Sequence, residues 1–498
     1  MDAALATFWQ RTLGEAKASR FGIVRSEEGR ILSVGDGVVK VSGLRDARMN
    51  ELIELGREGH GIVFDLHAEN IGVVLLSGGE MLKAGDSARK TDRIASILAG
   101  EGLLGRVIDA LGQPLDGGPV PKGLTGCPID RVAPAMIARD YVTTPLYTGI
   151  KIVDAMLSIG RGQRELIIGD PATGKTSLAL DTLFNQKNSD VISIYVSIGQ
   201  KRARILRTIE QIRNYGDPDK TVILAADASD SLGLQYLAPY SATAVAEYFL
   251  DLGRDVLIVY DDLSRHADAY RSLSLLLKRS PGREAYPGDI FFIHSRLLER
   301  SAQLNQKYGG GSITALPIVE TQQGRIASYI PTNLISITDG QIYLDENLFN
   351  KGIRPAVDVG RSVSRIGGKA QTEAMQAVAE RLKIDYSRFI EVEMFTRFGA
   401  RVEEETSKLI RRGERMREIF KQPRFHPVSF EDQVLTLLIL EAGGVEECET
   451  WVAAKHCEGI ITSIKDRFPE ILNRLMNEGR IRKSDMDRLT SFIVQGAH

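Results

Sequence analysis

The chain has 498 residues, more than one hydrophobic core of ordinary size accommodates, so we expect about three domains. Hydrophobic residues make up 43% and charged residues 26%, which is the balance of a globular protein and argues against a largely disordered chain. The 63 Lys and Arg residues nearly balance the 65 Asp and Glu residues, and the net charge of −2 argues against a broad binding surface for nucleic acid or an anionic membrane.

Residues 1–20 have the pattern of an amphipathic helical arm, because apolar residues recur at helical spacing. These apolar residues are Leu5, Phe8, Trp9, Leu13 and Ala16. The arm can pack on its own domain or dock on another subunit, and the sequence leaves both interpretations open. Because we find neither a signal-peptide pattern nor an uninterrupted run of 18 apolar residues, we expect a cytoplasmic chain that does not itself span a membrane.

Residues 21–93 are predicted to form a small closed or sandwiched β-domain, because short β-rich runs alternate with glycine-containing turns, and we expect a β-barrel domain there. The runs are Gly22–Val24, Ile31–Val34, Val38–Val41, Gly61–Phe64 and Ile71–Leu75. A stretch rich in Gly and Pro, Leu111–Pro121, and the segment Cys127–Pro145 then lead into the central domain as surface loops.

Residues 94–370 are predicted to form a central α/β domain. Apolar runs alternate there with helical patterns, which predicts a parallel sheet covered by helices. The predicted strands are Leu166–Ile168, Val191–Val196, Val222–Ala225, Val256–Tyr260, Ile290–Ile293 and Ile313–Val319.

A phosphate-binding loop is predicted between the strand-like run Glu165–Ile168 and the helical pattern of Ser177–Phe184. The loop residues fit the pattern G-x-x-x-x-G-K-[ST] and are Gly169, Asp170, Pro171, Ala172, Thr173, Gly174, Lys175 and Thr176. Glycines let backbone N–H groups face phosphate oxygens, Lys175 neutralises phosphate charge, and the Thr176 hydroxyl suits Mg²⁺. A plain glycine turn would explain the glycines but not the Gly-Lys-Thr. We therefore predict a P-loop (RecA-like) nucleotide-binding domain that takes ATP or ADP with Mg²⁺.

An acidic pair follows the apolar run Val256–Tyr260, which places Asp261 at the carboxyl end of a buried strand. In P-loop enzymes such a carboxylate holds Mg²⁺, so Thr176 and Asp261 are the predicted metal residues. Acidic residues after a strand are also common in solvated turns. The P-loop upstream favours the metal interpretation.

The residue that activates the attacking water is expected at the end of the strand that follows the P-loop helix, where ring-shaped ATPases usually carry a carboxylate. Here that residue is Gln200, whose amide can orient water but is a very poor proton acceptor near neutral pH. We therefore predict a site that holds nucleotide and turns it over slowly. The alternative is that Gln200 is merely polar and that an acid elsewhere is the base.

Residues 371–498 are predicted to form a helical domain, because strand patterns stop and helical spacing takes over. The predicted helices are Met375–Lys383, Tyr386–Phe398 and Arg401–Phe420.

The cysteines of the whole chain, Cys127, Cys448 and Cys457, are odd in number and lack C-x-x-C spacing. We predict neither a disulfide framework nor a zinc site.

The sequence resembles the alpha subunits of F-type ATP synthases over nearly its whole length. Besides the P-loop, the blocks that carry the resemblance are Pro145–Gly162 leading to Arg161–Glu165, then Tyr260–Ser264, Pro281–Asp289, Ser336–Ile342 and Arg354–Arg365. The resemblance implies a regulatory, largely non-catalytic subunit that alternates with beta subunits in an alpha3-beta3 ring around the gamma shaft and helps couple ATP synthesis or hydrolysis to ion translocation. It also implies a peripheral place at the cytoplasmic face of a bacterial or archaeal cell membrane, with membrane contact only through the complex.

The same resemblance implies that Arg365 is an arginine finger at the catalytic site of the neighbouring beta subunit, and that Ser362 positions the segment that carries it. The sequence departs from the family at two places. Pro171-Ala172 stands where Arg-Gln is usual, which leaves the nucleotide affinity open. The N-terminal arm differs from the usual one, which leaves open whether it binds the delta subunit of the peripheral stalk. An alternate, sodium-type operon variant of the synthase would accommodate both departures.

Two other ring ATPases share the P-loop core. A homohexameric export-type ATPase would need a catalytic Glu near position 200, where this sequence has Gln. An RNA-translocating helicase of the termination-factor type would be expected to carry an RNA-binding N-terminal module and a basic surface, and neither is evident in the sequence.

Overall fold

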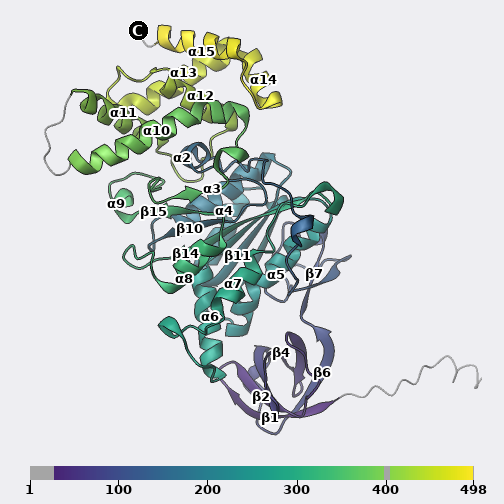
Figure 1. Cartoon of the computed structure of the whole chain (residues 1–498). Coiled ribbons are helices and arrows are strands. Elements are labelled where there is room, and N and C mark those ends of the chain that lie inside the picture. The colour runs from purple at the N-terminus through teal and green to yellow at the C-terminus, as the bar shows by residue number, and fades with distance from the viewer. Residues whose placement is uncertain (1–26, 397–403, 497–498) are drawn as a thin grey trace, which may run out of the picture. The chain divides into compact units, whose positions relative to one another are not determined.

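The computed structural model describes residues 27–396 and 404–496. The chain divides into two compact units, one ending at Ile94 and one beginning at Ala95 (Figure 1). The predicted arm over residues 1–20 and the predicted strand Gly22–Val24 lie outside the described residues.

The first unit contains a closed barrel of six antiparallel strands in the order β1-β2-β5-β4-β3-β6. The strands are β1 (Glu28–Gly35), β2 (Val38–Ser42), β3 (Glu51–Leu55), β4 (Gly59–Leu66), β5 (Asn70–Ser77) and β6 (Ser87–Ile94). Side chains such as Val39, Ile53 and Val73 form the barrel core. Between β1 and β2, Asp36 and Gly37 both have positive φ, the geometry of a two-residue hairpin turn that matches the twist of its strands.

Within the barrel, strands β3 and β6 are the two that the sequence alone does not predict. Strand β3 buries Ile53 and Leu55 but has Glu residues beside them, and within β6 only Ala88 is buried. Hydrophobic periodicity is therefore weak in both. Pairing on either side makes them strands: β3 pairs with β4 and β6, and β6 pairs with β1 and β3.

The second unit is built around an eight-stranded sheet in the order β16-β15-β10-β14-β13-β11-β12-β8. Neighbouring strands are parallel except β15 and β16. The strands are β8 (Val107–Ile108), β10 (Glu165–Gly169), β11 (Ile192–Gln200), β12 (Thr221–Asp227), β13 (Asp255–Asp261), β14 (Ser312–Glu320), β15 (Gly340–Leu344) and β16 (Val363–Ser364). Strands β7 (Ser96–Ala99) and β9 (Thr125–Pro128) form a separate antiparallel pair.

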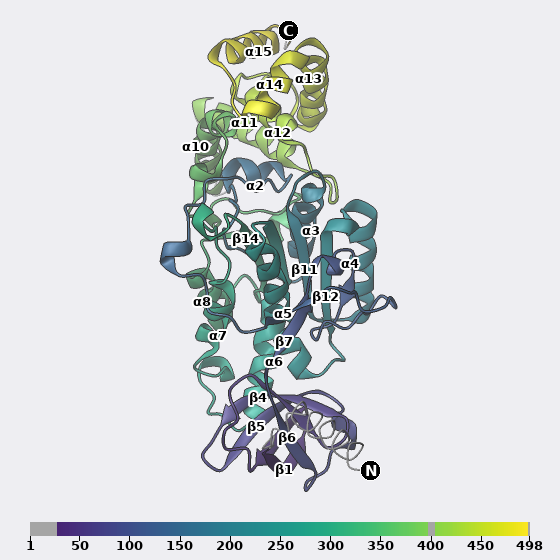
Figure 2. The same cartoon turned by 90° about the vertical axis from the view of Figure 1, so that its right-hand side faces the viewer.

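Helices cover this sheet in two groups (Figure 2). Helices α3 and α4 contact each other and the sheet, and α5 to α8 form the other group. The helices are α2 (Lys151–Met156), α3 (Lys175–Asn185), α4 (Arg202–Tyr215), α5 (Leu232–Asp251), α6 (Leu263–Leu276), α7 (Ile290–Leu298), α8 (Tyr329–Ile337) and α9 (Glu346–Asn350). Because both faces are covered, the central strands are buried on both sides and read as continuous apolar runs.

The predicted strand Ile290–Ile293 is wrong, because these residues begin helix α7. The side chains of Ile290, His294 and Leu297 are buried and lie at helical spacing, whereas Phe291 and Phe292 are exposed. A run of four apolar residues fits a strand or a helix equally well. The buried residues that follow it decide in favour of the helix.

The last part of the second unit is a bundle of helices. They are α10 (Glu373–Thr396), α11 (Glu404–Phe420), α12 (Phe430–Glu441), α13 (Ala453–Arg467), α14 (Pro469–Glu478) and α15 (Lys483–Gly496). The two predicted helices that start at Met375 and Tyr386 are one continuous helix, α10. Within the described residues, we find no helix with the length and hydrophobicity that a membrane crossing requires. The predicted fold class, a β-barrel followed by an α/β nucleotide-binding domain and a helical domain, is confirmed.

Candidate nucleotide-binding site

Four neighbouring strands end at residues that gather around the predicted P-loop. In the sheet order β10-β14-β13-β11, the last residues are Gly169, Glu320, Asp261 and Gln200. The carboxyl ends of parallel strands are the usual place for ligand sites in α/β sheets. The fold therefore brings the P-loop, the predicted metal carboxylate and the predicted water-orienting amide to one edge.

The P-loop connects β10 to helix α3, which begins at Lys175. Gly174 has φ 102°, a left-handed conformation that favours glycine. Pro171 and Ala172 lie in a tight turn in which the backbone N–H of Thr173 donates to the carbonyl of Asp170 at 3.4 Å, and Ala172 has φ 65°. Proline followed by a residue of positive φ is the pattern of a type II turn. The turn thus explains Pro171, whereas Ala172 adopts a φ that favours Gly or Asn.

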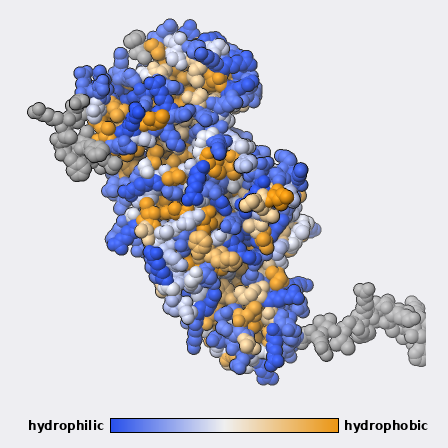
Figure 3. Space-filling model, viewed as in Figure 1, coloured by the Kyte–Doolittle hydropathy of each residue, from blue (hydrophilic) through white to orange (hydrophobic). Residues whose placement is uncertain are grey.

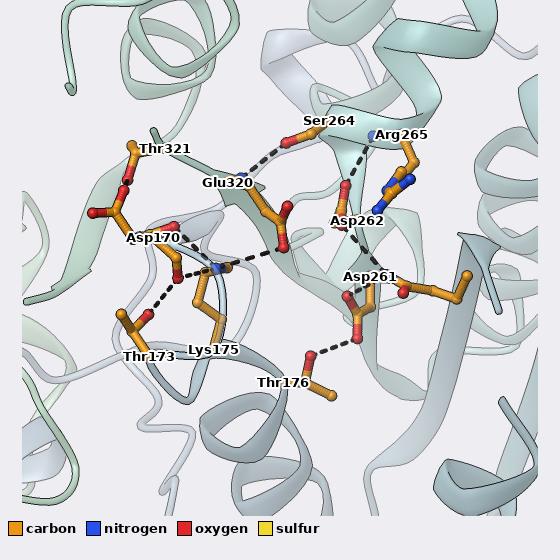
Figure 4. Close-up of polar contacts among 12 residues, drawn as sticks. Asp170, Thr173, Lys175, Thr176, Asp261, Asp262, Ser264, Arg265, Glu320 and Thr321 are labelled. Atoms are coloured by element: carbon orange, nitrogen blue, oxygen red, sulfur yellow. Dashed lines mark hydrogen bonds and ion pairs between the residues drawn. The ribbon is translucent and has the colours of Figure 1, made fainter. Parts of the chain in front are cut away.

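The carboxylate of Asp170 fastens the P-loop to the segment after β14. It accepts a hydrogen bond from the Thr321 hydroxyl at 2.6 Å (Figure 4) and another from the backbone N–H of Gly324 at 2.8 Å. The Thr173 hydroxyl donates to the Asp170 carbonyl at 2.8 Å. These hydrogen bonds within the protein fix the conformation of the P-loop.

The ammonium group of Lys175 lies across the P-loop. Its Nζ donates to the carbonyls of Gly169 at 2.9 Å and Asp170 at 2.7 Å, and it lies 3.8 Å from the Glu320 carboxylate (Figure 4). Burial lowers the pKa of Lys175, and the charges of Glu320, Asp262 and Asp261 oppose this lowering. The two carbonyls are neutral acceptors. Bound phosphate would offer the Lys175 ammonium negatively charged oxygens instead, and hydrogen bonds to such oxygens are stronger.

Thr176 and Asp261 are brought together as predicted. The Thr176 hydroxyl donates to Asp261 Oδ2 at 2.8 Å (Figure 4), and the Tyr195 hydroxyl donates to the same oxygen at 2.7 Å. The Asp261 side chain is 2% exposed, so its charge is shielded from water. A hydroxyl and a carboxylate are oxygen ligands of the kind that Mg²⁺ prefers, and these residues therefore fit that ion.

Gln200 reaches both acidic residues at the end of β13. Its Nε2 donates to Asp261 Oδ1 and to Asp262 Oδ2, at 3.3 Å each. Asp262 also accepts from the backbone N–H of Arg265 at 2.8 Å, and burial together with the charge of Asp261 raises the pKa of Asp262 to about 7. The amide is thus engaged with two carboxyl groups rather than pointing away from the site.

A pocket of about 1130 Å³ extends from the P-loop. Its walls also include residues of α4 and two segments from distant parts of the sequence, residues 349–356 and 421–424. Gln422 joins these two segments, because its backbone N–H donates to the Arg354 carbonyl at 2.8 Å. Its side-chain amide also donates to the Gly149 carbonyl at 2.8 Å. The volume is of the size that holds a small-molecule cofactor.

Arg365 and Ser362 lie away from this pocket. Arg365 follows the edge strand β16, is exposed, and its guanidinium donates to the Thr338 carbonyl at 3.3 Å. The Ser362 hydroxyl donates to the Asp358 carbonyl at 2.6 Å and accepts from the backbone N–H of Tyr343 at 2.9 Å. Neither residue lines the pocket of its own chain.

Several pocket residues were not predicted from the sequence. Glu320 ends β14 as Asp261 ends β13, and this parallel was the one signal available for it. Arg204 donates to the Thr176 hydroxyl at 2.7 Å, but its position among several basic residues after Gln200 gave no sign of that contact.

Three family profiles match successive parts of the sequence. They describe the beta-barrel domain of the ATP synthase alpha/beta family (residues 24–92), the nucleotide-binding domain of that family (residues 149–364) and its C terminal domain (residues 371–495). The protein belongs to the ATP synthase alpha/beta family.

Similar proteins include the ATP synthase subunit alpha of Dehalococcoides mccartyi, 49% identical over 91% of this chain and 90% of that protein. That of Petrotoga mobilis is 49% identical over 90% of each. The ATP synthase subunit alpha 1 of Chlorobium luteolum is 47% identical over 98% of this chain and 95% of that protein. The predicted resemblance to ATP synthase alpha subunits, which form part of an ATP-handling enzyme, is thus confirmed.

Proposed function

We propose that the protein is the regulatory, largely non-catalytic alpha subunit of a rotary F-type ATP synthase, which holds ATP or ADP with Mg²⁺ in its own P-loop site. The observation that carries this proposal is the amide of Gln200 at the end of β11, bonded to both Asp261 and Asp262. An amide orients water but cannot take its proton, so the site lacks a strong base at the position where one is expected.

In this proposal the P-loop amides and Lys175 bind the phosphates, while Thr176 and Asp261 hold Mg²⁺. Mg²⁺ bound at these two residues would supply positive charge that neutralises the phosphates. Phe349, Arg354 and Gln422 lie in the wall that the rest of the nucleotide would meet. These residues give an aromatic face and polar groups suited to a base and ribose.

Arg365 serves the neighbouring beta subunit in this proposal. Its backbone N–H donates to the Asp339 carbonyl at 3.0 Å, which fixes the backbone from which the exposed guanidinium extends. Ser362 braces the same segment by linking Asp358 to Tyr343. A fixed arginine at a neighbouring site stabilises the charge that develops on a transferred phosphoryl group.

The surface of the central domain supports contact with other subunits. Figure 3 shows hydrophobic patches among hydrophilic residues on one face of the molecule. Phe292 is 58% exposed on α7, and Val363, two residues before Arg365, is 46% exposed. Exposed apolar groups of this kind fit protein interfaces. The proposed partners are beta subunits in an alternating alpha3-beta3 ring, the gamma shaft and, through the N-terminal arm, a peripheral stalk.

The whole complex would couple ATP synthesis or hydrolysis to ion translocation at the cytoplasmic face of a bacterial or archaeal membrane. The subunit itself would be peripheral there. Its likeness to named ATP synthase alpha subunits over about nine-tenths of its length supports this placement.

Replacing Gln200 by Glu tests the non-catalytic assignment. The purified protein should bind ATP with little turnover, and Gln200→Glu should raise its own turnover at least about tenfold, because a positioned base contributes about 10²–10⁴ in rate. Turnover is followed by phosphate release, with ATP binding measured in parallel and Gln200→Ala as the control without a base. An unchanged rate in a Gln200→Glu variant that still binds ATP would contradict the assignment.

The competing function is a homohexameric export-type ATPase. It predicts that the purified protein forms rings without a beta subunit and hydrolyses ATP rapidly with Gln200 in place. Sedimentation of the protein alone, combined with the same phosphate assay, separates the two functions.

A further inference from the structure

Arg204 contacts the two residues that fit a Mg²⁺ ion. It lies in the first turn of α4, and its Nη2 donates to the Thr176 hydroxyl at 2.7 Å. The same nitrogen lies 3.9 Å from Asp261 Oδ2, the oxygen that accepts from the Thr176 hydroxyl. One nitrogen of a permanent cation is therefore beside both oxygen groups of the predicted metal site.

The charges around this point show why a cation is needed there. Asp261 is buried, and the carboxyl groups of Asp262 and Glu320 also lie at this edge of the sheet. A buried carboxylate without a cation is costly. Lys175, another cation of the site, is bonded to the P-loop carbonyls and lies 3.8 Å from Glu320. Arg204 is thus the guanidinium placed to offset Asp261.

Arg204 is also able to leave. Its side chain is 49% exposed, whereas that of Asp261 is 2% exposed. The guanidinium can move into solvent or toward the pocket by rotation about its side-chain bonds, without unfolding of α4. An arginine held by one hydrogen bond and one longer contact at a half-exposed position is weakly retained.

We propose that Arg204 is an internal counter-ion that holds the place of Mg²⁺ beside Thr176 and Asp261, and that Mg-nucleotide binds by displacing it. The inference rests on the proposed function of this site as a Mg-nucleotide site. Because the protein supplies its own cation, nucleotide binding depends less on Mg²⁺ than it would with a neutral residue at position 204. Arg204 therefore sets the Mg²⁺ dependence of the site.

The test compares ATP binding by the full-length protein in excess EDTA and in excess Mg²⁺, measured by calorimetry. The quantity of interest is the factor by which Mg²⁺ tightens binding. Arg204→Gln, which removes the charge but suits a helix, should increase this factor roughly tenfold over wild type. Arg204→Lys, which keeps a charge, should lie between the two. Arg207→Gln is the matched control, because Arg207 lines the same pocket one turn along α4 and is not bonded to Thr176 or Asp261 in the described structure.

A second readout does not use the affinity of ATP. Mn²⁺ replaces Mg²⁺, and its binding to the ATP-loaded protein is followed by electron paramagnetic resonance. Arg204→Gln should bind Mn²⁺ more tightly than wild type and Arg207→Gln should not. An unchanged Mg²⁺ factor in Arg204→Gln, or an equal change in Arg207→Gln, would overturn the role of Arg204 alone. A wild-type protein that binds ATP in neither buffer would overturn the nucleotide site itself, and the role of Arg204 with it.

Discussion

Asp181 links the P-loop helix to the segment that closes the nucleotide pocket. It lies on α3, and its Oδ1 accepts a hydrogen bond from the backbone N–H of Phe425 at 2.6 Å. Phe425 has φ 66°, and its ring packs against Phe184 and Tyr215 with centroids 5.6 Å and 5.1 Å away. One carboxyl group and one aromatic cluster thus anchor the segment that carries Gln422 into the pocket wall.

The pKa of Asp181 gives this link a pH dependence. Burial raises the pKa to about 7, above the 3.8 of an ordinary Asp, so the folded protein keeps a proton that the unfolded protein loses. Folding stability therefore falls as the pH rises from about 4 to about 7, and the full cost is present above pH 7. Each pH unit in that interval lowers the free energy of unfolding by about 1.4 kcal/mol.

Asp181→Asn should therefore stabilise the protein at high pH. The amide oxygen can still accept from Phe425, so the free energy of unfolding should rise by up to about 4 kcal/mol at pH 8, and the gain should vanish as the pH approaches 4. Urea unfolding of variant and wild type across this range measures the difference. Asp219→Asn, at an exposed position in the same unit, is the control. A gain that does not change with pH would show that Asp181 does not titrate in this range.

At the scale of single residues, the sequence predicts the groups that a motif fixes by spacing. The P-loop, Asp261 and Gln200 are found because a strand, a loop of set length and a helix determine where they lie. Arg204 and Glu320 depend on side-chain direction and on which strands are neighbours. Sheet order and rotamers are set by the whole fold, so no local pattern predicts these two residues.

At the scale of elements, the central sheet is predictable and the barrel less so. Strands β11 and β13 are buried on both faces, and their apolar runs are unambiguous. Strand β6 buries one residue, and it forms because it pairs with β1 and β3. The sequence of β6 alone does not reveal these two pairings. Helix α7 was predicted as a strand because the four apolar residues at its start fit the two-residue repeat of a strand as well as the 3.6-residue repeat of a helix.

A buried ion pair joins α5 to the segment after α7. Arg300 is 0% exposed, and it donates to both oxygens of Glu247 at 2.8 Å and to the Ile129 carbonyl at 2.8 Å. Every one of these bonds is lost if the guanidinium is removed. Glu247 would then be a buried carboxylate without a cation, which is far more costly than losing both partners together.

Arg300→Met should lower the free energy of unfolding by about 3–5 kcal/mol. Replacing Glu247 and Arg300 together by Leu should recover most of that loss, because no unpaired charge remains. Arg296→Met, which breaks the more exposed pair with Asp130, should cost about 1 kcal/mol or less. Denaturant unfolding of the three variants makes the comparison, and equal losses for Arg296→Met and Arg300→Met would contradict the argument.

At the scale of the whole molecule, the proposed function divides the catalytic machinery between subunits. The pocket of this subunit has a P-loop and metal-fitting oxygens but an amide where a base is expected. Arg365, unlike these pocket residues, is exposed and does not line the pocket of its own chain. The proposed role at a neighbouring site requires an arginine that is presented outward on a fixed backbone. The hydrogen bonds of Arg365 to Asp339 and Thr338 fix its segment in the way that this role requires.

Arg365→Lys in a complex reconstituted with beta and gamma subunits tests this division. Lysine keeps a positive charge but loses the planar fork of donors, so steady-state ATP turnover should fall about 10³-fold or more, the scale of an arginine finger. ATP binding at the P-loop of this subunit should stay within about twofold of wild type, because Arg365 does not line that pocket. Arg361→Lys is the matched control: Arg361 is exposed, lies four residues before Arg365 and pairs with Asp358 of its own chain, so turnover should be retained. Turnover near the wild-type rate in an assembled Arg365→Lys complex would contradict the role of Arg365 at the neighbouring site. Equal losses of turnover in the Arg365→Lys and Arg361→Lys complexes would indicate disturbed assembly rather than lost stabilisation of phosphoryl charge.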